Sequence, residues 1–220
     1  MHTLEFFHDA VCGWCYLQSP RLREVVTSLD DNITVIHRSF VLQRNRQEMI
    51  ARFGSMERAK SDILGHWQQC KLHAEQPERI NIDGMRKASF EYPSGYAAAL
   101  AAKAAEHLGG QKGHWDYFDR VQTAHLRDNL NIANHTVLEC LAEDMGHNRL
   151  RFRELMRSEA VREAVDQDNA RAKSIGVLTI PSILVNGTRL ISQTLTSEQL
   201  TAVLTHLFTE SPAGERHETV

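Results

Sequence analysis

The 220-residue sequence lacks a long hydrophobic run, a surplus of basic side chains and a dense cysteine pattern. Its longest apolar run, residues 97–105, is interrupted by Lys103 and is far shorter than the roughly 20 residues that span a bilayer. The 25 Lys and Arg residues are outnumbered by 28 Asp and Glu residues, so there is no basic surplus to bind phosphates. We therefore expect a globular protein whose partners include neither a membrane nor a nucleic acid.

The N-terminal segment lacks the features of an export signal. It has no basic region, and Glu5, His8 and Asp9 interrupt the stretch where a signal peptide needs an apolar core. We therefore expect a cytoplasmic location. The four cysteines are too few for a disulfide scaffold in a chain of this length, and in a reducing compartment a cysteine pair is more often catalytic or metal-binding than structural.

The sequence does contain two groups of short strand patterns. Apolar residues at 4–8 and 33–40 indicate two strands, and the spacing of Leu22, Val25 and Leu29 indicates a helix between them. Strand, helix and strand in this order form a βαβ unit, whose strands pair in parallel through a right-handed crossover. Near the C-terminus the strand pattern returns as a hairpin that is followed by a helix.

The hairpin is indicated by apolar residues at 182–185 and 189–192 on either side of Asn186-Gly187, a strong turn signal. A capping box at 196–199 begins the last helix. These elements supply the ββα half of a mixed α/β fold.

The residues between the two groups, 43–175, have helical spacing throughout. The longest expected loop is 74–93, which holds two prolines, and one helix is expected to end at Gly109-Gly110 before another begins at Trp115. The predicted fold class is α/β. We predict a discontinuous domain of residues 1–42 and 176–210, an all-helical insertion at 43–175 and a flexible tail at 211–220.

Two cysteines stand two residues apart in Cys12-Gly13-Trp14-Cys15, where the first strand gives way to a helix. A helix N-terminus offers free N–H groups and the positive end of the helix dipole, which stabilise a thiolate placed there. Such a thiolate attacks a disulfide and forms a mixed disulfide, which a second cysteine resolves. We predict that Cys12 is the nucleophile and that Cys15, which the helix shields, is the resolving thiol.

A second signal lies in Thr179-Ile180-Pro181-Ser182, where a proline directly precedes the late strand, an expected place for a cis peptide bond. A CxxC at a strand-to-helix junction together with this late Ile-Pro resembles the thioredoxin fold, and the large helical insertion resembles its DsbA-like branch. The sequence segment FFHDAVCGWCY is most similar to the cytosolic FrnE-like members of that branch. The resemblance covers residues 4–208.

The resemblance implies a thioredoxin-like βαβ…ββα fold with a helical insertion and the activity of a protein-disulfide oxidoreductase or isomerase. It implies that Cys12 and Cys15 are the redox pair, that Pro181 is the cis-proline, that the backbone of Ile180 binds an extended substrate and that Trp14 borders the groove. It also implies no bound metal or organic cofactor, with glutathione as the one candidate co-substrate. The partners that it implies are protein or small-molecule disulfides and thiols.

Two other functions stay open. Related DsbA-like folds include the kappa-class glutathione transferases and 2-hydroxychromene-2-carboxylate isomerase, which bind glutathione and usually carry serine in place of the first cysteine. A glutathione-dependent isomerase or transferase is therefore the main alternative, and a metal-binding stress protein that uses Cys12, Cys15 and a histidine is the third. Gly13 departs from the proline of many FrnE-like proteins, so the resemblance fixes neither the redox potential nor the direction of electron flow. The oligomeric state is left open.

Several other residues carry weaker signals. His66, Cys70 and His73 fall on one face of a predicted helix, either as a metal or redox cluster or as an ordinary helix face, and the ordinary face is favoured because no further ligand completes a tetrahedral set. His8 is expected either to support the thiolate or to lie at the surface at the end of the strand. Asp9 is expected to turn the chain out of that strand.

Three further expectations concern packing. Cys140, between two leucines, is expected to be a small buried residue. Phe90 and Tyr92 are expected to line the groove over the cysteines, and the aromatic residues at 115–118 are expected to belong to the core.

Overall fold

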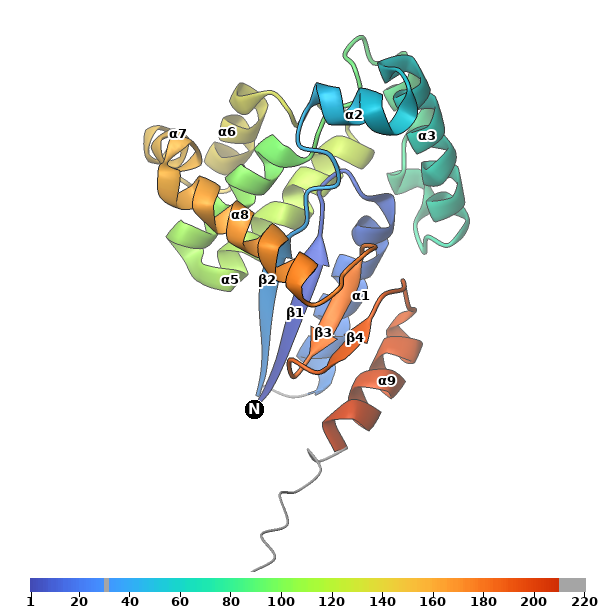
Figure 1. Cartoon of the computed structure of the whole chain (residues 1–220), viewed down its shortest axis with the longest axis vertical. Helices are drawn as coiled ribbons and strands as arrows, with labels where there is room; N and C mark the ends of the chain where they lie inside the picture. The colour runs from blue at the N-terminus through green and yellow to red at the C-terminus, as the bar shows by residue number, and fades with distance from the viewer. Residues whose placement is uncertain (30–31, 210–220) are drawn as a thin grey trace, which may run out of the picture.

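The sheet has four strands in the order β2-β1-β3-β4, as the computed structural model shows (Figure 1), which describes residues 1–29 and 32–209. β1 pairs in parallel with β2 and antiparallel with β3, and β3 pairs antiparallel with β4. The predicted α/β fold with its βαβ and ββα halves is confirmed. The strands are β1 (His2–His8), β2 (Ile33–Ser39), β3 (Ser182–Val185) and β4 (Arg189–Ile191).

Helix α1 (Gly13–Leu29) connects β1 to β2, and α9 (Ser197–Thr209) follows β4. The other helices lie between β2 and β3 in the sequence, as the helical spacing predicts. They are α2 (Arg46–Phe53), α3 (Met56–Leu72), the short 3₁₀ helix η1 (Pro77–Arg79), α4 (Ile82–Lys87), α5 (Tyr96–Leu126), α6 (His135–Asp144), α7 (Arg149–Arg157) and α8 (Glu159–Ser174). In the part of the chain that the structure describes, no helix is both long enough and apolar enough to cross a membrane.

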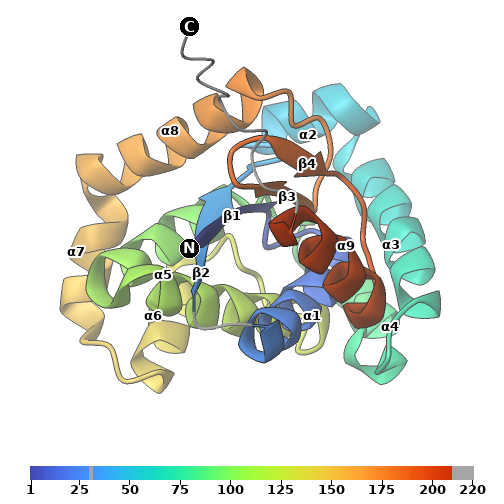
Figure 2. The same cartoon turned by 90° about the horizontal axis from the view of Figure 1, so that it is seen from below.

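Helices cover both faces of the sheet. Seen from below, α1 and α9 lie together on one side of the sheet, α8 crosses the other side, and α5 lies by β2 (Figure 2). The alternation of side chains along β1 explains this arrangement. Leu4 and Phe6 join the large apolar cluster that also holds Leu22 of α1, whereas Phe7 points to the other face and packs against Ala172 of α8.

The inserted helices share the core of the sheet. One continuous apolar cluster includes Phe6 of β1, Trp67 of α3 and Phe118 of α5, all of them buried. Burial on this scale is the main favourable term that holds the layers together. The end of β1 that leads into the CxxC turn is therefore held in place on several sides by packed helices.

Two details of the insertion differ from the sequence predictions. The segment 74–93 is not one loop, because it contains η1 and α4, where the side chain of Asn81 caps the helix by accepting a hydrogen bond from the Gly84 N–H. Helix α5 runs through 109 and 110 but is broken there, since Gly110 has a φ of 62°. The break is where the sequence predicts it, but the second half of α5 begins before Trp115. The predicted tail at 211–220 lies outside the described residues.

Candidate functional site

Cys12 and Cys15 lie where β1 passes into α1. The N–H of Cys12 donates to the carbonyl of Asp9 at 3.1 Å and so closes the turn, and the N–H of Cys15 donates to the Sγ of Cys12 at 3.3 Å. Cys12 keeps 9% of its surface exposed, whereas Cys15 is fully buried. A helix N-terminal amide thus points at the more accessible sulfur, an arrangement that stabilises negative charge on it.

The segment before β3 lies directly against this sulfur. The Ile180–Pro181 peptide bond is cis, and the Cys12 thiol donates to the carbonyl of Ile180 at 3.8 Å. Cys12 and Ile180 are 168 residues apart in the sequence. The sheet brings them together because β1 and β3 are neighbours in it.

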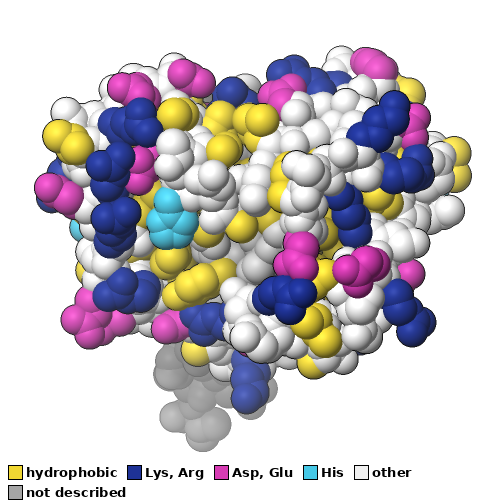
Figure 3. Space-filling view, turned by 90° about the horizontal axis from the view of Figure 1, so that it is seen from above, with side chains coloured by type: hydrophobic (Ala, Val, Ile, Leu, Met, Phe, Trp, Pro, Cys, Tyr) yellow, Lys and Arg dark blue, Asp and Glu magenta, His cyan; other side chains and the backbone are white. Residues whose placement is uncertain are grey.

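A mainly apolar pocket of about 310 Å³ opens beside Cys12. The space-filling view from above shows hydrophobic side chains gathered toward the middle of that face and charged ones mostly nearer its margin (Figure 3). Arg52 and His66 are the basic groups that line the pocket. Its apolar lining includes Trp14, Leu42, Met49, Phe53, Ile63, Trp67, Tyr92, Leu178 and Ile180.

A second, polar groove lies on the other side of Trp14 and Ile180. These two residues, with Thr179, line both hollows, while Pro181 and Arg21 line only the polar one. Other polar lining residues include His73, Ser192, Gln193, Thr194, Thr196 and Gln199. Of the predicted substrate-binding residues, Trp14 and Ile180 therefore lie between the two hollows, and Pro181 lies in the polar groove alone.

The chain matches the DSBA-like thioredoxin domain over residues 3–205. It belongs to this family. Members of the family are thiol-disulfide oxidoreductases or isomerases. Among curated proteins, no sequence matches the chain.

Solved structures share the fold of this DSBA-like domain at low sequence identity. A Nitrosomonas europaea protein described as a protein disulfide isomerase has a TM-score of 0.78 at 19% identity, over 96% of this chain and 99% of its own. The cytosolic disulfide reductase DsbM of Pseudomonas aeruginosa, solved with GSH, has a TM-score of 0.70 at 21% identity, over 94% and 98%. A 2-hydroxychromene-2-carboxylate isomerase has a TM-score of 0.61 at 15% identity, over 94% of each chain.

Asp9 holds the turn that presents Cys12 in the DSBA-like domain. Its carboxylate accepts hydrogen bonds from the N–H of Leu42 at 2.9 Å and of Val11 at 3.3 Å, which agrees with its predicted role in turning the chain. Burial raises the pKa of Asp9 to about 6, although hydrogen bonds from backbone N–H groups oppose the shift. Gly95 packs so closely that a Cβ there would lie 1.8 Å from the Asp9 Oδ1.

Helix α3 places a third cysteine behind the CxxC turn. Cys70 is fully buried, and a Cβ on Gly13 would lie 2.9 Å from its Sγ. Burial, with the nearby Cys12 sulfur adding to it, raises the pKa of the Cys70 thiol to about 12. Among the described residues, His66, Cys70 and His73 do not form a group that could hold a metal ion, which agrees with the favoured interpretation of an ordinary helix face. The first two line the apolar pocket and His73 lines the polar groove.

Neither expectation for His8 is right. Its side chain is 2% exposed, and its Nε2 lies 3.1 Å from the Nδ1 of His37 rather than on the surface or against the thiol. Sequence reasoning missed this contact because His37 lies on a different strand.

Of the remaining packing expectations, some are confirmed and others are wrong. Tyr92 lines the apolar pocket and donates to the carbonyl of Val11 at 3.2 Å, whereas Phe90 lies beside Lys60 and is not among the residues that line the pocket. Trp115, Tyr117 and Phe118 are buried in the core as predicted. Cys140 is only half-buried, so its expected burial is wrong, because it lies toward the outer side of α6.

Proposed function

We propose that this DSBA-like domain is a thiol-disulfide oxidoreductase in which Cys12 attacks and Cys15 resolves. The observation that carries the proposal is the geometry at Cys12. Cys12 lines the apolar pocket, and its sulfur accepts a hydrogen bond from the first turn of α1 and lies 3.8 Å from the carbonyl oxygen of Ile180, a residue that lines both hollows. Activated cysteines occupy such sites at helix N-termini.

The reaction proceeds by two exchanges. The Cys12 thiolate attacks one sulfur of a substrate disulfide, the substrate S–S bond breaks, and one substrate thiolate leaves. Cys15 then loses its proton and attacks the Cys12 sulfur, so that the second substrate thiolate leaves and a Cys12–Cys15 disulfide remains. The substrate gains two electrons and the protein loses two, and the reverse sequence oxidises a substrate dithiol.

The burial of Cys15 sets the order of these steps. Burial raises the pKa of the Cys15 thiol well above its ordinary value, and the adjacent Cys12 sulfur raises it further. Cys15 therefore stays protonated during the first exchange. Once the Cys12 sulfur is part of a mixed disulfide it no longer raises the pKa of Cys15, so one obstacle to ionising Cys15 disappears.

Substrate binding falls to Trp14, Ile180 and Pro181. In this proposal the backbone of Ile180 hydrogen-bonds an extended peptide, and an apolar substrate side chain next to the attacked sulfur enters the pocket beside Cys12. Protein disulfides and small-molecule disulfides both fit these hollows. Neither a metal nor an organic cofactor takes part in the exchange.

The finer assignment is a FrnE-like enzyme of the cytoplasm that exchanges electrons with glutathione. This assignment is supported by the sequence around the CxxC motif and by the similarity in fold to DsbM, which is a cytosolic disulfide reductase solved with GSH. In this assignment residues 1–42 and 176–210 carry the catalytic domain, and the insertion at 43–175 supplies the walls of the apolar pocket.

The test is the exchange rate of reduced protein with a protein disulfide. We expect Cys12→Ser to reduce the rate to that of the buffer alone, while Cys140→Ser, which changes a half-buried cysteine outside both hollows, leaves it unchanged. Full activity of the Cys12→Ser protein would refute the proposal.

The direction of electron flow follows from the reduction potential of the pair. Equilibration in glutathione buffers with a count of free Cys12 thiol measures it. A potential near about −270 mV marks a thioredoxin-like reductant, and one near about −120 mV marks a DsbA-like oxidant. A failure to form the Cys12–Cys15 disulfide at any buffer ratio would exclude both.

A glutathione-dependent isomerase is the second candidate. The observations that favour it are the likeness in fold to 2-hydroxychromene-2-carboxylate isomerase and the pocket of about 310 Å³ beside Cys12. Glutathione-dependent isomerisation of 2-hydroxychromene-2-carboxylate by the Cys12→Ser/Cys15→Ser protein separates the two functions, because turnover without the dithiol is expected of the isomerase alone.

A further inference from the structure

A second cluster of reactive side chains lies behind the thiol site. His8 ends β1, His37 lies in β2 and His114 lies in the second half of α5, with ring centroids 5.0 to 5.3 Å apart. They are 2%, 0% and 0% exposed. One ring nitrogen from each lies within 4.8 Å of the other two. The dithiol reaction uses none of them.

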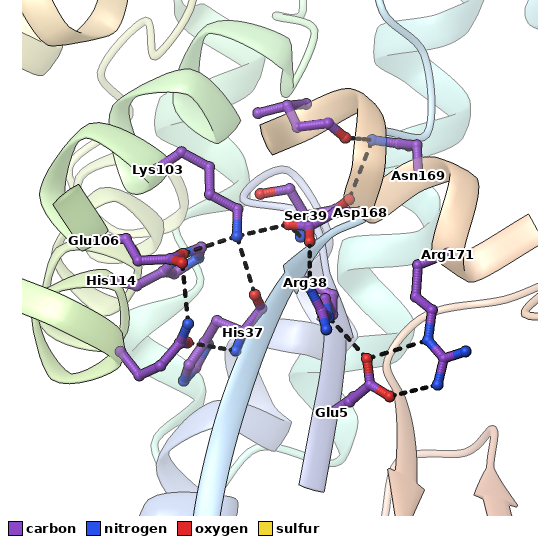
Figure 4. Close-up of polar contacts among 12 residues, drawn as sticks. Glu5, His37, Arg38, Ser39, Lys103, Glu106, His114, Asp168, Asn169 and Arg171 are labelled. Carbon is purple, nitrogen blue, oxygen red and sulfur yellow. Dashed lines mark hydrogen bonds and ion pairs between the residues drawn. The ribbon is translucent and has the colours of Figure 1, made fainter. Parts of the chain in front are cut away.

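The ring nitrogens are incompletely paired. His8 Nε2 and His37 Nδ1 lie 3.1 Å apart. His114 Nδ1 lies 2.7 Å from the Oε2 of Glu106 (Figure 4). In the described part of the chain, the Nε2 atoms of His37 and His114 are buried with no hydrogen-bond partner. Buried polar atoms of native proteins are nearly always paired. The orphaned Nε2 of His114, whose Nδ1 is held by Glu106, is therefore a free ligand atom in the cluster, whereas His37 offers the cluster its Nδ1.

The spacing fits a metal ion with imidazole ligands. Zinc binds histidine nitrogen at about 2.0–2.1 Å, which places two nitrogens of a tetrahedral site about 3.3 Å apart. The 3.1 Å between His8 Nε2 and His37 Nδ1 is close to that value, and His114 needs only a small movement to join them. Glu106 on the far nitrogen of His114 matches the carboxylates that orient metal-bound histidines.

Aromatic side chains pack against the histidine cluster. A neutral imidazole is the form of histidine that binds metals. The ring centroid of Phe118 lies 3.8 Å from that of His8, and the ring centroid of Trp115 lies 4.8 Å from that of His37, so aromatic side chains help to exclude water.

Lys103 does not block the site, because two carboxylates hold it. Its Nζ lies 2.8 Å from Glu106 and 2.8 Å from Asp168 (Figure 4). The wider network adds Arg38, Glu5 and Arg171, and the charges of its three acidic and three basic side chains cancel. The site therefore suits an ion that three neutral imidazoles hold, as in zinc sites whose fourth ligand is water or hydroxide.

We propose that His8, His37 and His114 bind one zinc-class transition-metal ion. The ion links β1, β2 and α5, and so joins the sheet to the inserted helices. Because all three side chains are buried, the ion enters during folding or during a slow opening of α5. Its expected role is structural, since all three ligands are buried and neither of the two hollows includes any of them.

The test is metal binding by the full chain, produced without an affinity tag, unfolded with a chelator and refolded with Co²⁺ or Zn²⁺. We expect one tightly held equivalent and a cobalt spectrum that has d–d absorption but lacks the sulfur-to-cobalt charge-transfer band. A spectrum with that band places the metal on the cysteines and overturns the proposal. So does refolded protein that holds no metal.

Variants separate this site from the thiols. We expect Cys12→Ser/Cys15→Ser to keep its one equivalent, which also makes the result independent of the proposed redox function. His114→Gln should lose the equivalent and the rise in melting temperature that zinc gives, whereas His66→Gln, in the thiol pocket, should keep both. If His114→Gln does not fold, the cobalt spectrum of the Cys12→Ser/Cys15→Ser protein decides alone. Unchanged stoichiometry in a folded His114→Gln protein would refute the assignment.

Discussion

His8 and Cys12 are four residues apart, yet they lie in opposite environments. Cys12 faces an apolar pocket and a polar groove, and its sulfur receives an N–H from α1. His8 faces inward, where two other histidines and aromatic rings enclose it. The end of β1 thus leads into the proposed site of disulfide exchange and also contributes to a buried histidine cluster. The comparison suggests that activity and stability depend on different neighbours of the same short segment.

The largest expected effect falls on the open site alone. In the Cys15→Ser protein the first exchange proceeds but the second has no nucleophile, so a mixed disulfide should accumulate on Cys12 and turnover should stop. The melting temperature should change little, because serine is of similar size. Mass spectrometry of the trapped adduct checks this.

One outcome of the adduct experiment would contradict this prediction. Cys70 also lies behind the CxxC turn, so an adduct that resolves without Cys15 would show that Cys70 replaces it. The Cys15→Ser/Cys70→Ser protein is the matched control, and it should hold the adduct in either case.

Next in size is a change at the boundary of the two regions. A methyl group at Gly95 would lie 1.8 Å from the Asp9 Oδ1, so Gly95→Ala must displace the carboxylate that accepts from Leu42 and Val11. We expect a loss of about 3 kcal/mol in the free energy of unfolding and a slower exchange, because the Cys12 turn moves with Asp9. Denaturant unfolding measures the first effect, and the exchange assay measures the second.

Gly65→Ala is the control for this substitution. Gly65 lies within α3 with nothing near its added methyl group, so alanine should raise the free energy of unfolding by about 0.5–1 kcal/mol. Equal effects of the two substitutions would show that Asp9 moves aside without cost.

The two regions also differ in what the sequence reveals. Cys12 and Cys15 are contiguous with the start of a helix, and the late Ile-Pro is a local signal too, so the sequence pattern was enough to predict the fold and to propose the redox pair. Cys70 behind Gly13 and the histidines around His8 come from separate elements. Their signals were a glycine between the two cysteines and a histidine inside a strand, and neither signal identifies the residue that it contacts.

The short helices of the insertion were also difficult to predict from the sequence. The helix Ile82–Lys87 has too few residues to show a period, and a cap by Asn81 determines it instead. Long elements such as α8 were predictable, because their apolar residues repeat along a buried face.

A smaller effect tests why Gly13 stands in the CxxC. Gly13→Ala places a methyl group 2.9 Å from the Cys70 Sγ, within a wall that also holds Trp67. We expect a loss of about 1–3 kcal/mol in the free energy of unfolding. Cys70→Ala removes the opposing sulfur, so the Gly13→Ala/Cys70→Ala protein should recover most of that loss.

A double-mutant cycle of Gly13 and Cys70, measured by denaturant unfolding, checks the contact. A coupling energy of about 1 kcal/mol or more indicates direct contact. Additive effects would mean that the glycine serves the turn and not the cysteine behind it.

The smallest effect lies farthest from the thiols, in the ion network on the α8 side of the sheet. Burial alone would raise the pKa of Glu5, but Arg171 and Arg38, both at 2.8 Å, outweigh it and lower the pKa below the usual 4.5. Because the folded pKa is the lower one, Glu5 stabilises the fold above about pH 4.5, and this contribution is lost as the pH falls through the folded value.

Glu5→Gln should therefore cost about 1–2 kcal/mol at pH 7 and progressively less as the pH falls below 4.5 toward the lower pKa of the folded state, where the wild-type carboxyl takes up a proton. Denaturant unfolding of both proteins from pH 7 to 3 measures this convergence, with the exposed Glu163→Gln as the control. The exchange rate at pH 7 should not change, since Glu5 touches neither hollow. A constant difference in stability at all pH values would mean that Glu5 contributes through its shape and not through its charge.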